Sequence, residues 1–307
     1  MRERGNRNQG TRRNRLSTLF TSFLFPLSLF PVLSSAQVPD VRARADLSLS
    51  LDYRNQSDRA NLRLYNPLGR PSTVTLTLLL EPGFTVLVSE RLQRLPGDAE
   101  NDIFDEVYIE DPGIWRVGKQ YLPFGAGRLL RESVPAARID SNLIAERVPV
   151  TLALFNAGDG RQNGFVVRVG RSVGASVANG EHLGISGTSL GVIRRPSDAP
   201  GKGSGWKRAF GMDASRRFGK LGLSAEIGFF TGGPLRDLAV SDLEATYFSD
   251  NYRTVGLGFS HASGPFDGDT LRFFGRVRAA RNVDLEPLVR WKDNAFYDAS
   301  VTLRVRL

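Results

Sequence analysis

The sequence predicts an all-β protein: a transmembrane antiparallel β-barrel with an even number of strands, about 12 to 16, after a cleaved N-terminal signal peptide. Three observations lead to this prediction. The chain begins with an Arg-rich stretch, an apolar run and small residues, which is the pattern of an export signal. Short segments in which apolar and polar residues alternate then continue to the last residue. One side of these segments is charged and needs water, whereas the other side is apolar.

Residues 1–36 are expected to be removed as the signal peptide, so that residues 37–307 form the barrel. Six arginines lie in residues 1–15, before the apolar run Leu16–Leu33 and the small residues Ser34-Ser35-Ala36. A positive start, an apolar centre and small residues before the cut define a secretory signal peptide. A retained transmembrane anchor is the alternative, but this run is at the lower limit of a membrane span and contains two prolines. The cleavage site is therefore expected after Ala36.

Composition argues against several other kinds of protein. The chain has no Cys and two His, so it offers no disulfide framework, no thiolate metal site and no imidazole-rich metal centre. The formal net charge is +9, but much of the basic excess belongs to the N-terminal arginines. The remaining basic residues form no recognition motif, so nucleic acid is not an expected partner. No metal or cofactor is expected either.

The part of the chain after the signal peptide has no apolar run long enough for a membrane helix, and its alternating segments define the expected strands. In the first segment Leu47, Leu49 and Leu51 alternate with Ser48 and Ser50. About fourteen to seventeen such segments are linked by turns rich in Gly, Pro, Asn and Asp. Besides a central hairpin, the expected strands are 45–53, 60–65, 73–80, 84–89, 148–155, 165–169, 183–193, 209–218, 221–231, 243–248, 254–261, 271–279, 283–291 and 300–307.

The last expected strands decide between a barrel and a soluble β-protein. A soluble sandwich or solenoid would also show alternation, so the period alone does not separate these folds. Here, however, the polar face is charged, and a barrel in a membrane places such a face in a wet lumen and its apolar neighbours in lipid. Closure also removes the open sheet edges that a long exported β-protein would have to protect. The alternating arginines are Arg272, Arg276, Arg278, Arg304 and Arg306.

The central stretch Phe104–Gly125, FDEVYIEDPGIWRVGKQYLPFG, predicts a β-hairpin. Apolar and polar residues alternate on both sides of Asp111-Pro112-Gly113, and Pro-Gly favours a turn. Asp105–Gly125 resembles a motif of bacterial outer-membrane porins, in which an acidic D-E-x-Y strand precedes a strand ending V-G-K-Q-Y-x-P-F-G. The resemblance is closest to the phosphate-selective porins and the siderophore-uptake porins that are similar to them. Arg147–Gly158, RVPVTLALFNAG, lies where those porins have a strand ending F-N-G, so the likeness covers roughly fifty residues.

The resemblance implies a passive channel of about sixteen strands in the outer membrane, with no chemistry of its own. Members of the family are often homotrimers, and their C-terminal Phe or Trp is recognised by the barrel-assembly machinery. This chain departs from the family there, because it ends in Leu307, and it is also shorter than most members. The expected partners are thus the lipid bilayer, the assembly machinery, small solutes or anions, and two further copies of the chain.

The expected function is passive diffusion of small hydrophilic solutes, with a preference for anions. The longest stretch without a clear strand is Tyr121–Glu146, and a long loop in a compact fold is often functional. One interpretation folds this loop into the lumen, where Arg128 and Arg131, together with Arg116 and Lys119, line a constriction. The other leaves it outside, with its charges in solvent, as charge runs usually are. The sequence leaves both open.

A lipid esterase or deacylase is the alternative function. His261-Ala262-Ser263 is similar to the His-x-Ser pair of outer-membrane phospholipases and lipid-A deacylases, in which the His takes the proton of the attacking Ser. In those enzymes Asn-Gly follows the Ser, whereas Gly264-Pro265 follows here. Their third catalytic residue would fall on Gly275. Because a triad needs its orienting group, we expect the protein not to be an enzyme.

Overall fold

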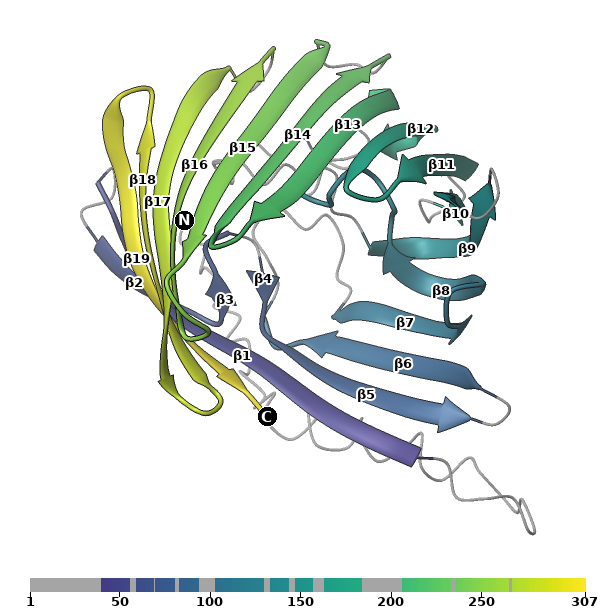
Figure 1. Ribbon diagram of the computed structural model, residues 1–307, viewed down its shortest axis with the longest axis horizontal. Helices are drawn as coiled ribbons and strands as arrows, with labels where there is room; N and C mark the ends of the chain where they lie inside the picture. Colours follow the sequence, from purple (N-terminus) through teal and green to yellow (C-terminus); the bar gives the residue numbers. More distant parts are fainter. Residues whose placement is uncertain are drawn as a thin grey trace, which may run out of the picture. The chain divides into compact units, whose positions relative to one another are not determined.

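The computed structural model describes residues 40–55, 59–68, 70–80, 83–93, 103–129, 133–143, 147–156, 163–183, 206–232, 236–264 and 267–307 (Figure 1). Asp40–Leu307 forms one compact unit. The expected signal peptide, residues 1–36, lies outside the described residues. Within the ranges given above, no helix is long and apolar enough to cross a membrane.

In the described chain, sixteen strands in the ring close into one antiparallel barrel. This number is the upper end of the 12 to 16 strands expected from the sequence. β19 closes the ring by pairing with β1, with Leu303 opposite Leu49. A short strand, β2 (Arg59–Arg63), also pairs with β1 and shares one ring position with β5. The predicted all-β fold and antiparallel barrel are confirmed. In ring order the strands are β1 (Asp40–Arg54), β5 (Thr73–Leu80), β6 (Phe84–Arg91), β7 (Phe104–Asp111), β8 (Trp115–Tyr121), β9 (Ser133–Leu143), β10 (Val148–Asn156), β11 (Asn163–Gly170), β12 (Val173–Leu183), β13 (Trp206–Phe218), β14 (Leu221–Thr231), β15 (Leu238–Phe248), β16 (Arg253–Ser263), β17 (Gly268–Ala280), β18 (Val283–Lys292) and β19 (Ala295–Arg306).

Alternation along each strand separates an outer face from a lumen face. On β16, Val255, Leu257 and Phe259 are exposed by 64%, 43% and 39%, although they are large and apolar. Ser260, on the other face of the same strand, is 1% exposed. An apolar exposed band around a ring without open edges is what a lipid environment requires. Charged side chains are buried on the lumen side, among them Asp52, Asp213, Asp242, Arg272, Arg290 and Asp298.

The outer face provides a direct test of membrane insertion. Leu257 lies near the middle of β16, and we expect Leu257→Arg to destabilise the barrel in lipid by roughly 2–4 kcal/mol, because a guanidinium near the bilayer centre loses its hydration. Val255→Arg, nearer the end of the same strand, should cost only about 0–1 kcal/mol. Unfolding in urea from phospholipid vesicles measures both values. Equal values for the two variants would contradict the membrane orientation.

Turn chemistry ends the strands where the sequence predicts it. β7 and β8 form the expected hairpin, with Asp111 opposite Trp115 and Gly113 at a φ of +84°. β18 and β19 are joined by Asp293-Asn294, whose φ angles of 51° and 63° are those of a type I′ hairpin turn. Asp and Asn tolerate this left-handed region better than most residues. These two-residue and three-residue turns fix the register of the strands they join.

Two predicted segments differ from the structure. The predicted loop Tyr121–Glu146 contains a complete strand, β9, so the irregular part between β8 and β9 is shorter than expected. Pro135 and the charges of Arg138 and Asp140 hide the alternation of β9 in the sequence. The predicted strand 183–193 lies almost wholly outside the described residues, and the structure instead places β12 at Val173–Leu183, where small residues such as Gly and Ala weaken the pattern.

Candidate functional site

The segment of residues 122–129, between β8 and β9, folds against the inner face of the barrel wall. Leu122, Phe124 and Leu129 are exposed by only 4%, 1% and 0%. They belong to one apolar cluster with side chains from the inner face of strands β9 to β16. An apolar contact of this kind holds the segment in place without any covalent link. The wall residues of the cluster are Ala136, Phe155, Val166, Ala178, Trp206, Ala209, Phe230, Leu238, Val240 and Ala262.

The local sequence LPFGAGRL explains the sharp path of this segment. Gly125 and Gly127 have φ angles of +54° and +73°, which favour glycine. The Phe124 N–H donates to the Leu122 carbonyl at 2.9 Å, and the Gly127 N–H donates to the Phe124 carbonyl at 3.1 Å. These two tight turns present Phe124 and Leu129 to the wall.

Polar contacts fix the backbone of the same segment to three strands. The Gly125 N–H donates to Ser176 Oγ of β12 at 2.9 Å, and Arg168 Nε of β11 donates to the Gly125 carbonyl at 2.8 Å. The Arg128 N–H donates to Glu226 Oε2 of β14 at 3.0 Å. Glu226 is fully buried. Because buried backbone groups need partners, these bonds specify one position for the segment.

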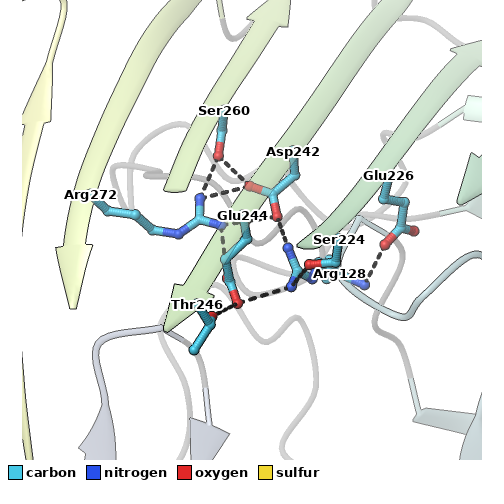
Figure 2. Close-up of polar contacts among 8 residues, drawn as sticks. All are labelled: Arg128, Ser224, Glu226, Asp242, Glu244, Thr246, Ser260 and Arg272. Atoms are coloured by element: carbon cyan, nitrogen blue, oxygen red, sulfur yellow. Dashed lines mark hydrogen bonds and ion pairs between the residues drawn. The ribbon is translucent and has the colours of Figure 1, made fainter. Parts of the chain in front are cut away.

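The side chain of Arg128 ends in a network of charges on the lumen wall (Figure 2). Its guanidinium lies 2.8 Å from Asp242 Oδ2, 3.2 Å from Glu244 Oε1 and 2.6 Å from Ser224 Oγ. Arg272 of β17 contacts the same two carboxylates, at 2.6 Å and 3.3 Å. Two guanidinium groups thus face two carboxylates. The network stabilises the segment, and the charge of Arg128 is compensated locally.

The four predicted constriction residues do not form one cluster. Arg116 donates to Glu110 at 2.7 Å and lies over the ring of Tyr108 at 4.0 Å, away from the partners of Arg128. Lys119 lies opposite Val107 on β7 and is two residues from Val117, whose side chain faces outward. Lys119 is therefore on the outer face of β8, whereas Arg116 is on the lumen face. Arg131 lies outside the described residues.

Three network residues were not predicted from the sequence, whereas Arg272 was expected on the lumen face of its strand. Asp242 and Glu244 occupy alternate positions on the inward face of β15, and Glu226 lies on the inward face of β14. Strand parity could have identified these three as lumen residues, because Leu243, which lies between Asp242 and Glu244, faces outward. Their partnership with Arg128 could not be found in this way, because it depends on where the 122–129 segment docks.

A second group of charges lies on the lumen face of β17, β18, β19 and β1. Arg278 contacts Asp284 at 3.2 Å, and Arg306 contacts the same carboxylate. Arg304 bridges Asp46 and Glu286. Arg276 has no ion pair among the described residues. Within this group four guanidinium groups, Arg276, Arg278, Arg304 and Arg306, face three carboxylates, Asp46, Asp284 and Glu286.

The two residues of the alternative esterase pair have separate partners. His261 Nδ1 lies 2.8 Å from Asp269 Oδ1, and both side chains are about half exposed. Ser263 Oγ donates to the Ala239 carbonyl at 3.5 Å. In this described part of the chain no hydrogen bond joins His261 to Ser263. The two side chains therefore hydrogen-bond to different groups in this structure.

Comparisons with known proteins identify the fold. No protein-family model and no curated protein sequence matches the chain. Among solved structures, a loop L8 deletion mutant of OmpT, an outer membrane protein of Vibrio cholerae, superimposes with a TM-score of 0.62 at 10% identity, covering 88% of this chain and 100% of that one. OmpF of Salmonella typhi in complex with daunomycin gives 0.56 at 8% identity, over 88% of this chain and 98% of that one. The anion-selective porin from Comamonas acidovorans gives 0.54 at 11% identity, over 88% and 99%. The chain therefore has the sixteen-stranded fold of outer-membrane porins.

Proposed function

We propose that this protein is an outer-membrane porin that lets small hydrophilic solutes diffuse passively. The main support is the 122–129 segment, which apolar packing and hydrogen bonds from three strands fix inside a barrel whose outer face is apolar. A segment held there narrows the passage and stays in one place, as a size filter requires. The protein is then a channel and not an enzyme.

The signal peptide expected from the sequence and the apolar outer face support a location in the outer membrane. Partners would be the lipid bilayer and the barrel-assembly machinery. A trimeric form of OmpT from Vibrio cholerae, with a TM-score of 0.56 at 10% identity over 88% of this chain and 100% of that one, supports a homotrimer. The likeness of Asp105–Gly125 to the phosphate-selective and siderophore-uptake porins supports that branch of the porins as the relatives of this chain.

We also propose a mild preference for anions. Arg128 is compensated by Asp242 and Glu244, so the preference would come instead from the wall formed by β17, β18, β19 and β1. Arg276, like Arg44 of β1, has no carboxylate partner among the described residues, and it lies on the same face of β17 as the paired Arg272 and Arg278. An uncompensated guanidinium facing water in a narrow passage attracts anions and repels cations.

Reversal potentials across a KCl gradient in planar bilayers test this proposal. The unmodified protein should show chloride preference, and Arg276→Gln should move its reversal potential toward zero. Arg216→Gln is the matched control, because Arg216 lies over the ring of Phe218 on the outer face and is exposed there. It should leave the potential unchanged. A preference for K⁺ would contradict the anion proposal, and the absence of channels would contradict the porin proposal.

A further inference from the structure

The strand next to β1 in the barrel wall is interrupted in the middle, because β2 and β5 each form one part of it. β1 pairs with β2 through Ser50–Arg54 and with β5 through Asp40–Asp46. The intervening part of β1, residues 47–49, is three residues long, whereas the chain between β2 and β5, residues 64–72, is nine. A continuous strand would need only three residues there. We call the chain between β2 and β5 the excursion. Strand paired with β1 lies on both sides of it, so the excursion leaves the wall between the two rims of the barrel and is not a loop at a rim.

The excursion folds inward. Ser50 Oγ donates to the Tyr65 carbonyl at 2.7 Å, and Asn66 Nδ2 donates to Glu286 Oε2 at 2.8 Å. Arg290 Nη1 donates to the Pro67 carbonyl at 3.5 Å. Ser50, Glu286 and Arg290 all belong to the lumen face of their strands. Figure 1 shows β3 (Tyr65–Asn66) and β4 (Arg70–Pro71), the two short strands of the excursion, inside the ring.

The excursion is also firmly held. Tyr65 and Asn66 are exposed by 6% and 5%, and their strand pairs with β4. Ser72 Oγ accepts the Ser48 N–H at 2.7 Å and donates to the Ser48 carbonyl at 3.0 Å. A pair of bonds to one residue of β1 fixes the point where the chain rejoins the wall. Satisfied buried polar groups of this kind favour one conformation.

The excursion is anchored to the wall opposite that of the 122–129 segment. Its partners lie on β1 and β18 and on the residues just after β6, whereas those of the 122–129 segment lie on β11, β12, β14 and β15. In the closed ring of sixteen, β12 is eight positions from β1 in either direction. The two inward segments are thus anchored to opposed walls.

We propose that the excursion, residues 64–68 and 70–72, is a second constriction element that sets the upper size of the solutes that pass. The proposal rests on the proposed channel function. Solutes would then pass between two fixed segments on opposed walls. The passage is therefore narrower than the diameter of the barrel. Removing either segment should widen the passage, because conductance and size exclusion depend on the narrowest point of a pore.

The register specifies the variant that removes the excursion. Replacing residues 64–72 with Leu-Ser-Val leaves three residues between Arg63 and Thr73, both of which face inward. The new Leu and Val would face lipid and the new Ser would face the lumen, so β2 and β5 would become one continuous strand. We expect single-channel conductance to rise roughly two- to threefold, and neutral oligosaccharides that the unmodified protein excludes to enter liposomes. Retarded migration after heating confirms that the variant folds.

A second variant tests the same proposal with the excursion left intact. The chain has no Cys, so Arg70→Cys introduces a single thiol on β4, at an exposed position. A bulky thiol reagent added from the aqueous side should then lower the current. Val173→Cys, with its side chain 68% exposed on the outer face, is the matched control and should show no change.

The outcomes separate the two proposals. If the unmodified protein forms no channel, the porin proposal is wrong. If it conducts, but the excised variant has unchanged conductance and the modified Arg70→Cys variant keeps its current, the second constriction is wrong and the porin proposal stands. A folded excised variant with higher conductance and a blocked Arg70→Cys variant would both support the inference.

Discussion

Asp242→Ala is expected to destabilise the barrel by about 3–5 kcal/mol, because it removes one partner from a buried network of charges. The Asp242 side chain is 3% exposed and contacts Arg272 at 2.6 Å and Arg128 at 2.8 Å. It also accepts the Ser260 hydroxyl at 2.6 Å. Without it, the nearly buried Arg272 would keep the Ser260 hydroxyl, at 2.7 Å, and a single carboxylate, Glu244, at 3.3 Å. Urea unfolding in detergent micelles, followed by tryptophan fluorescence, measures the loss.

Glu244→Ala is the matched control for this variant. Glu244 contacts the same two guanidinium groups, but its side chain is 23% exposed and its distances are 3.2 Å and 3.3 Å. Partly exposed ion pairs at these longer distances contribute less than buried ones, so the loss should be about 1 kcal/mol or less. Ion selectivity is a second readout. In Asp242→Ala, Arg128 loses its shortest ion pair, so its positive charge is less compensated and the preference of the channel for chloride should increase. If both variants lost the same stability, the assignment of Asp242 as the centre of the network would be wrong.

The sequence predicted the features that depend on neighbouring residues. Alternation identified the outer face, and Asp111-Pro112-Gly113 identified the hairpin between β7 and β8, because strand parity and turn geometry are local properties. The arginines of β17 and β19 were correctly placed on one face for the same reason. These predictions need no knowledge of which strands meet across the lumen.

The path of the 122–129 segment could not be predicted in this way. A uniformly hydrated interior was expected, and that expectation is wrong for strands β9 to β16, where Phe155, Val166, Phe230 and Val240 face inward and are buried. These strands have apolar residues on both faces, which weakens their alternation in sequence. The inward apolar patch is buried by the 122–129 segment that packs against it. That contact joins residues far apart in the chain, so alternation within single strands does not reveal it.

The interruption of the wall between β2 and β5 was missed for a related reason. The sequence Leu64–Ser72 contains Pro, Gly and Asn, which predict a turn, and a turn is equally compatible with a rim loop. Only the register of both strands against β1 shows that the excursion leaves the wall between its rims. Register is a property of the paired strands together, and single strands do not reveal it.

Glycine at two positions of the 122–129 segment allows a matched test of how that segment is docked. Gly125 and Gly127 both have positive φ angles, so an alanine at either position has a similar backbone cost of roughly 1–2 kcal/mol. Their surroundings differ. A Cβ at Gly127 would have no heavy atom within 4 Å, whereas a Cβ at Gly125 would overlap Glu226 Oε1 and lie 2.7 Å from the Glu226 carboxyl carbon.

Gly125→Ala should therefore undock the segment, and Gly127→Ala should not. The Glu226 carboxylate is fully buried and accepts the Arg128 N–H at 3.0 Å, so it cannot move away from the new methyl group without releasing that bond. Release of Arg128 also strains its contacts with Asp242. We expect Gly125→Ala channels to show larger conductance and frequent fluctuations between levels in single-channel recordings, while Gly127→Ala channels keep one steady level. Steady channels of unchanged conductance in Gly125→Ala would show that Glu226 does not hold the segment, and the constriction would then depend on the apolar cluster around Phe124 and Leu129 alone.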